Sequence, residues 1–100
     1  MAFLMQIKIK PRAKEDLLEI WHFIAHERFQ IQAADHLMMR FNNEFRRLAN
    51  NPNLGTLCFK VNPEFRQQVL DPYLIFYKVE QDMLVIYRIL HSVRNISNLL

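Results

Sequence analysis

The sequence predicts an α+β fold in which a helical hairpin packs on one face of a four-stranded, mainly antiparallel sheet. Three observations predict it. Apolar residues at helical spacing are confined to the first half of the chain, β-branched and aromatic residues dominate after Gly55, and a short alternating segment precedes the helices. The predicted order is therefore β-α-α-β-β-β. Because 100 residues suffice for one core, we expect residues 1–100 to form one domain.

The first predicted strand spans residues 5–10. Met5, Ile7 and Ile9 alternate with polar residues, which is the period of a strand with one buried face. Pro11 ends this segment. Since no strand follows it directly in the sequence, we expect it to join the sheet that forms later in the chain.

Two helices follow. The first is predicted over residues 13–28, where Pro11 suits the helix start and Glu15 and Asp16 suit its positive end. Its apolar positions are Leu17, Leu18, Trp21, Ile24 and Ala25. The second helix ends at Asn50-Asn51-Pro52, and its apolar positions are Ala34, Leu37, Met38, Phe41, Phe45 and Leu48. A short connection predicts an antiparallel hairpin.

Three strands are predicted over residues 65–70, 73–80 and 83–91. Asp71-Pro72 and Gln81-Asp82 make short connections, which favour an antiparallel meander. The helical hairpin would cover one face of the sheet and leave the other for a partner.

Composition narrows the class of protein. Apolar residues make up 51% of the chain and aromatic residues 12%, which excludes a disordered chain. The net charge of +3 permits a nucleic-acid or acidic protein partner but does not require one. Cys58 is the single cysteine, so we expect a half-buried apolar residue in a reducing compartment. No segment resembles a signal peptide or a membrane span, and we expect a cytoplasmic protein.

No cofactor or metal is expected. His22 and His26 lie four residues apart on the first helix, but Glu19 alone offers a third ligand, so we predict no metal site. A single glycine excludes a glycine-rich phosphate loop.

Four segments in order carry a resemblance to a known family, the RelE/ParE toxins of type II toxin–antitoxin systems. They are residues 11–17, 48–55, 73–77 and 85–94, and the resemblance covers nearly the whole chain. The resemblance implies a toxin whose activity is inhibited by an antitoxin. One branch of the superfamily cleaves mRNA on the ribosome, whereas the ParE branch is not a nuclease and inhibits DNA gyrase, which blocks replication.

The residues favour the ParE branch. RNA cleavage needs a proton acceptor, a cation for the phosphate and an acid for the leaving oxygen. Leu74 stands where the RelE-like nucleases often have arginine, and Gln67 and Gln68 stand where they tend to have lysines. Residues 97–100 include no tyrosine or histidine. We therefore expect no catalytic residues. The alternatives are a ribosome-dependent nuclease that uses Arg66, Arg88 and His91, or a non-toxic antitoxin-binding module.

The expected gyrase-binding residues are Arg88, His91 and Arg94. Arg88 and His91 lie three apart on one strand and should face opposite sides of the sheet, with Arg88 beside Leu84, Ile86 and Leu90. Arg88 could instead anchor the sheet or pair with Glu80 or Asp82, and His91 could bond to backbone.

The expected partner is a ParD-like antitoxin. Its disordered, amphipathic and acidic segment would fold on binding, with contacts at Trp21, Leu37, Phe41 and Phe45. We expect neither membrane association nor direct sequence-specific DNA binding.

Overall fold

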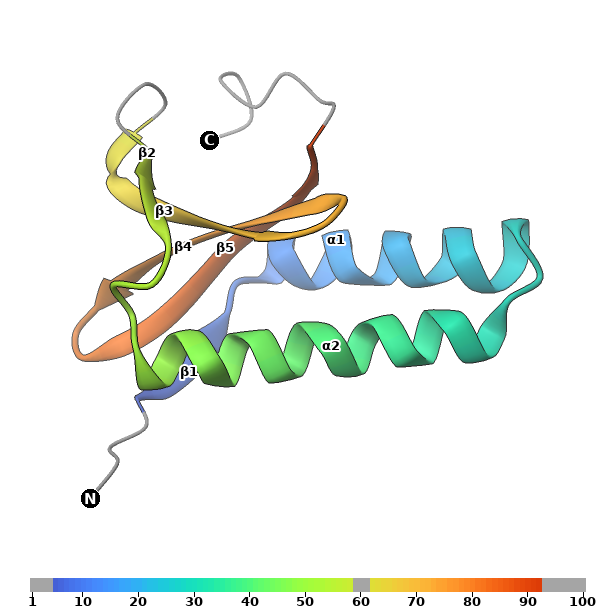
Figure 1. Cartoon of the computed structure of the whole chain (residues 1–100), viewed down its shortest axis with the longest axis horizontal. Coiled ribbons are helices and arrows are strands. Elements are labelled where there is room, and N and C mark those ends of the chain that lie inside the picture. Colours follow the sequence, from blue (N-terminus) through green and yellow to red (C-terminus); the bar gives the residue numbers. More distant parts are fainter. Residues whose placement is uncertain (1–4, 59–61, 93–100) are drawn as a thin grey trace.

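The computed structural model describes residues 5–58 and 62–92 (Figure 1). Strand β1 precedes two helices, and four strands follow them. The elements are β1 Gln6–Ile9, α1 Pro11–His22, the π-helical turn η1 Phe23–Glu27, α2 Ile31–Asn50, β2 Thr56–Cys58, β3 Asn62–Leu70, β4 Tyr73–Glu80 and β5 Met83–His91. The α+β class and the element order are confirmed.

The sheet has five strands where four were predicted. The added strand β2 has three residues, too few to show a period of two, and it pairs with β3 at the edge of the sheet. The strand order is β1-β5-β4-β3-β2. β1 pairs in parallel with β5, and the other neighbours are antiparallel. The expectation that the first strand joins the later sheet is confirmed.

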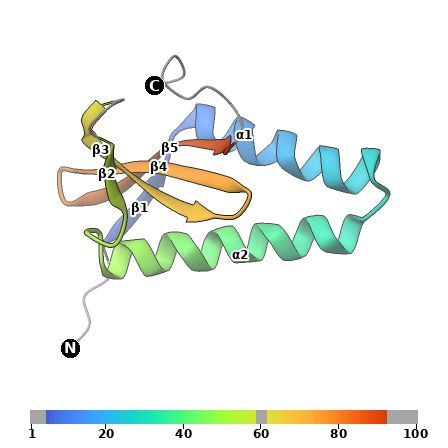
Figure 2. The ribbon, with the colours of Figure 1, turned by 45° about the horizontal axis from the view of Figure 1, so that its top comes forward.

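The main core lies between the helices and one face of the sheet. Figures 1 and 2 show α1 and α2 antiparallel, with their connected ends projecting beyond the strands. Apolar residues of α2 pack against β4 and β5, and the most deeply buried side chains, each at most 1% exposed, include Phe41, Phe45, Leu48, Ile75, Tyr77, Leu84 and Ile86. Burial of these side chains supplies the main driving force for folding.

The connection from α2 to β2 is held by Tyr77. Its hydroxyl donates a hydrogen bond to Pro52 O (2.8 Å) and accepts one from Gly55 N–H (2.8 Å). A Cβ atom at Gly55 would lie 2.5 Å from Tyr77 Oη and 2.8 Å from Gln67 O. Glycine is therefore required here by space.

Two expectations about the first helix are wrong. Leu18, which the apolar spacing placed on the buried side of the helix, is 57% exposed. Asp16 does not serve the positive end of the helix, because its side chain is 5% exposed and contacts β5. Sequence spacing alone could not distinguish this buried carboxylate from an ordinary residue of the first helical turns.

A β-bulge at Tyr87 corrects the predicted faces of β5. Tyr77 is opposite Ile86, yet Phe76 is opposite Arg88, so one extra residue interrupts the alternation. Leu84 and Ile86 belong to the helix-side core, whereas Phe76 and Leu90 belong to a smaller cluster on the outer face. Arg88 therefore shares its face with Leu90, and its predicted neighbours Leu84 and Ile86 lie on the other side.

Candidate functional site

An ion pair joins Arg88 to α1. β1 pairs with β5 only as far as Ile86, so beyond that point β5 has no strand on that side. Asp16 occupies the edge: its carboxylate accepts hydrogen bonds from Ile89 N–H (2.9 Å), Arg88 Nε (2.8 Å) and Arg88 Nη2 (3.1 Å). The side chains of Arg88 and Asp16 are 11% and 5% exposed. The suggested partners Glu80 and Asp82 were wrong; Arg88 anchors β5 to the first helix.

His91 ends β5 on the opposite face from Arg88. It is aligned with Tyr73, a helix-side residue, and the two rings meet edge to face with centroids 5.7 Å apart. Since Arg88 is aligned with Phe76 of the outer cluster, the predicted opposition of Arg88 and His91 is confirmed. Arg94 lies outside the described residues.

Arg66 is separated from His91 along the sheet, and it lies on the face opposite to that of Arg88. It donates hydrogen bonds to Gly55 O (2.8 Å) and Asn53 O (3.5 Å). Arg66 is opposite Tyr77, whereas His91 is opposite Tyr73, four residues further along β4. At about 3.4 Å per residue the two rows are roughly 14 Å apart. Arg66, Arg88 and His91 therefore do not converge on one point.

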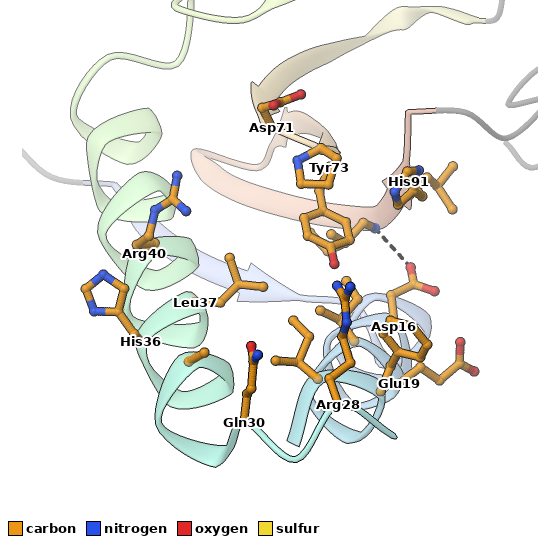
Figure 3. A pocket seen from close by; sticks show the side chains of 17 residues that line it. Asp16, Glu19, Arg28, Gln30, His36, Leu37, Arg40, Asp71, Tyr73 and His91 are labelled. Atoms are coloured by element: carbon orange, nitrogen blue, oxygen red, sulfur yellow. Dashed lines mark hydrogen bonds between the residues drawn. The ribbon is translucent and has the colours of Figure 1, made fainter. Parts of the chain in front are cut away.

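A groove of about 750 Å³ opens between the helices and the end of the sheet (Figure 3). Its apolar lining includes Ile20, Ile24, Leu37 and Tyr73. Charged or ionisable side chains also line it, and they include Arg28, His36, Arg40, Asp71 and His91. Burial raises the pKa of the Tyr73 phenol, and the positive charge of Arg28 acts in the opposite direction. The groove thus combines an apolar lining with cationic groups.

The four predicted antitoxin-binding residues are distributed over different environments. Leu37 lines the groove and is 9% exposed. Phe41 and Phe45 are each 1% exposed and belong to the core. Trp21 is half-buried on α1, and its indole Nε1 donates to Asp35 Oδ1 (2.8 Å). Within the described chain, Leu37 is therefore the one member of the four that faces the groove.

No metal site was predicted at the histidine pair of α1, and Cys58 was predicted to be a half-buried apolar residue. His22 and His26 stack with ring centroids 5.1 Å apart, but no group of three His, Cys, Asp or Glu side chains in residues 5–58 and 62–92 could hold a metal ion. Cys58 is 6% exposed, and burial raises the pKa of its thiol.

A group of polar residues on the outer face of the sheet was not predicted from the sequence. We call it the outer-face cluster, and it consists of Lys10, Lys78, Glu80 and Tyr87. The Nζ atoms of Lys10 and Lys78 lie 5.2 Å and 5.5 Å from the centre of the Tyr87 ring. The Tyr87 hydroxyl donates a hydrogen bond to Glu80. This bond and the nearby Lys78 ammonium lower the pKa of Glu80, and partial burial and the same bond raise that of Tyr87. The bulge and the parallel pairing of β1 bring these residues together, and neither feature has a local sequence signal.

None of the helices in the described parts of the chain has the length and apolar character needed to cross a membrane.

Comparison with known proteins gives one consistent result. A family model described as the ParE toxin of the type II toxin–antitoxin system parDE matches residues 7–96. Toxin ParE1 of Mycobacterium tuberculosis, from strains CDC 1551 / Oshkosh and ATCC 25618 / H37Rv, is 26% identical over 85 residues, which is 84% of this chain and 86% of the relative.

Two solved structures share the fold. The chromosomal ParDE toxin–antitoxin system from P. aeruginosa aligns with a TM-score of 0.72 and 21% identity over 88% of this chain and 96% of the other. The RelBE2 toxin–antitoxin complex from Mycobacterium tuberculosis aligns with a TM-score of 0.61 and 16% identity, covering 89% and 99% of the two chains.

Proposed function

The chain belongs to the ParE toxin family of type II toxin–antitoxin systems, and from that membership we propose that it inhibits DNA gyrase and so blocks replication. The observation that carries the proposal is the match of the ParE toxin family model to residues 7–96. In this proposal the toxin acts by binding, without catalytic residues of its own, in the cytoplasm.

The geometry around β5 supports a binding role. The guanidinium groups of Arg66 and Arg88 are engaged by backbone carbonyls and by Asp16, respectively, and the three residues suggested for nuclease chemistry are spread across the sheet. The proposed target-binding residues are Arg88, His91 and Arg94. Within this set Arg88 acts mainly by position, since its side chain is 11% exposed and fixes the strand that presents His91.

A cognate antitoxin completes the proposed system. The solved relative from P. aeruginosa is described as a ParDE toxin–antitoxin system, which supports a ParD-like partner for this chain. We propose that a disordered antitoxin segment folds on the toxin when it binds. Such a segment gives up conformational entropy on ordering and therefore needs a surface with both apolar and charged contacts.

The outer-face cluster supports a second candidate, ribosome-dependent mRNA cleavage. Lys10 and Lys78 could hold a phosphate, the ionised Glu80 could accept a proton from a ribose hydroxyl, and the neutral Tyr87 could donate one to the leaving oxygen. The lowered pKa of Glu80 makes its carboxylate a weak base, which disfavours this chemistry near neutral pH.

An induction experiment separates the candidates. The protein is expressed from a tightly controlled promoter, and incorporation of labelled thymidine and labelled leucine is followed. A gyrase inhibitor stops DNA synthesis first, and His91→Ala should weaken that effect. An mRNA nuclease stops protein synthesis first, and Tyr87→Phe should weaken that effect. Undisturbed growth with a folded protein would identify a non-toxic antitoxin-binding module.

A further inference from the structure

The connection between the two helices exposes large apolar side chains. We call residues 23–31 the hairpin tip; it comprises η1, the following loop and the first residue of α2. Phe29 is 90% exposed, the highest value among the large apolar side chains of the described chain, and Phe23 and Ile31 are 53% and 56% exposed. Figures 1 and 2 show that this end of the hairpin projects beyond the strands. Three apolar side chains are thus gathered at a protruding end of the molecule.

The backbone at Phe29 has a conformation that bulky residues rarely adopt. Its φ is 54°, in the left-handed region, and the next N–H, that of Gln30, donates to Ile24 O (3.1 Å) and closes the helix end. Glycine is the usual residue at such a position, because it has no Cβ. The two other positive φ values in the described chain, at Gln81 and Asp82, belong to the two-residue turn between β4 and β5. Phenylalanine at position 29 therefore costs stability, and burial of its ring does not offset that cost.

The helix that leads to the tip also departs from α-helical geometry. The Arg28 N–H donates to Phe23 O (3.2 Å), which is the five-residue step of a π-helix. Short π-helical turns are rare and frequently lie at functional sites. Backbone strain and exposed apolar side chains are likewise found together at binding surfaces. Three separate features of the hairpin tip therefore indicate an interaction surface.

The charges of the hairpin tip favour a protein as the partner. Glu27 and Arg28 carry the two full charges of residues 23–31, and these charges cancel. Nucleic acids and anionic membranes are bound by surfaces with an excess of lysine and arginine. An apolar surface without excess charge instead fits an apolar pocket of another protein.

The area of the hairpin tip is too small to hold a second copy of this chain. A fully exposed aromatic side chain offers about 150–250 Å², so the three partly exposed side chains together offer roughly 400 Å². Two tips in contact would bury roughly 800 Å², whereas a stable interface needs about 1,200 Å² or more. The tip is therefore one part of a larger interface with a different protein.

The hairpin tip adjoins the region proposed for target binding. Gln30 and Ala33 line both the groove described above and a second hollow beside Phe29. His91, a proposed target-binding residue, lines the same groove. A partner surface that extends from His91 to the tip would therefore form one continuous contact with the toxin.

We propose that Phe29 is an anchor residue of the toxin and inserts into an apolar pocket of DNA gyrase. This inference rests on the proposed function, because it names gyrase as the partner. Aromatic side chains that enter a pocket carry a large share of the binding energy of many interfaces. The backbone at position 29 holds the ring outward before the partner binds, so less conformational entropy is lost on association.

One variant separates function from stability. Phe29→Gly removes the exposed ring and relieves the backbone, so its melting temperature should be unchanged or higher. The toxin concentration that halves gyrase supercoiling should nevertheless rise at least about tenfold. Phe29→Trp keeps an aromatic ring and should retain most of the inhibition. Leu18→Ala is the matched control, because Leu18 is an exposed apolar residue of α1 outside the tip, and it should leave inhibition unchanged.

Photo-crosslinking tests the contact itself. A phenylalanine that carries a benzophenone group replaces Phe29, and the labelled toxin is irradiated with gyrase and DNA. We expect a covalent product of toxin and gyrase. The same group in place of Leu18 should give little product. Equal amounts of product at the two positions, or none at position 29, would overturn the inference.

The outcomes distinguish this inference from the proposed function. Gyrase inhibition by Phe29→Gly as strong as by the wild type, or an equal loss in Leu18→Ala, would overturn the inference and leave the proposed function in place. A lower melting temperature of Phe29→Gly would show that the ring supports the fold, and would overturn it as well. Wild-type protein without effect on gyrase would overturn the proposed function and gyrase as the partner.

Sedimentation equilibrium tests the alternative of a second copy. We expect the wild type and Phe29→Gly to have the same mass at every concentration. A wild-type dimer that Phe29→Gly dissociates would assign the hairpin tip to self-association and overturn the inference.

Discussion

Asp16 and Arg88, 72 residues apart in the sequence, form a nearly buried two-point ion pair that ties α1 to β5. The pairing of β1 with β5 ends at Ile86. Beyond that point the same carboxylate accepts the Ile89 N–H and so takes the place of a neighbouring strand. One short side chain thus fixes the part of β5 that leads to His91.

Removal of this carboxylate should be costly. Asp16→Ala removes the carboxylate that pairs with the nearly buried Arg88 guanidinium and accepts the Ile89 N–H, so we expect the free energy of unfolding to fall by about 3–5 kcal/mol. Urea denaturation measures it. Glu15→Ala, which removes the exposed Arg12–Glu15 ion pair on the same helix and leaves Asp16 in place, is the control and should leave the midpoint nearly unchanged. A small effect of Asp16→Ala would mean that the pair does not anchor β5.

Space around Gly55 gives a second prediction. Gly55→Ala places a methyl group against Tyr77 Oη and the backbone oxygen of Gln67, which cannot move freely. We expect a loss of about 3 kcal/mol by chemical denaturation, at the upper end for overpacking. Tyr77→Phe removes the hydroxyl and should cost about 1–3 kcal/mol, because Pro52 O and Gly55 N–H lose their partner. The double variant should recover part of the loss, since the clash with Oη disappears; full additivity would contradict this account.

The Tyr87–Glu80 hydrogen bond should be visible in a titration. It holds the pKa of Glu80 below its ordinary value of 4.5, so the interaction stabilises the fold above that pH and is lost as the pH falls through the lowered pKa. Tyr87→Phe should return the pKa of Glu80 toward 4.5, as followed by NMR of the carboxyl carbon. Lys78→Met should produce a smaller shift in the same direction. An unchanged pKa in Tyr87→Phe would show that Lys78 dominates.

Cys58 should react slowly in the folded protein. Burial raises the pKa of its thiol above 9.0, so little thiolate is present near neutral pH, and access is restricted as well. Alkylation by iodoacetamide, followed by mass spectrometry, should therefore be much faster in urea than in buffer. Equal rates in the two conditions would show that this part of β2 opens readily.

Periodicity predicted the elements but could not predict their long-range contacts. The apolar spacing of Phe41, Phe45 and Leu48 predicted α2, because each of those positions faces the core. The bulge at Tyr87 depends on pairing between β4 and β5, so a local pattern placed Arg88 beside the wrong neighbours. Arg28 and Arg40 join one groove only after the chain folds, and no spacing between them indicates it. Features that depend on residues within one element could be predicted from the sequence. Contacts that form only between elements of the folded chain could not.

A gyrase supercoiling and DNA-cleavage assay with the purified protein, run beside a ribosome-dependent mRNA cleavage assay, tests whether this toxin acts on gyrase. We expect inhibited supercoiling with trapped gyrase–DNA cleavage complexes, intact mRNA, and a weaker effect in His91→Ala. Unaffected gyrase with cut mRNA would contradict gyrase inhibition. If Tyr87→Phe also abolished the cutting, the mRNA cleavage activity would be assigned to the outer-face cluster.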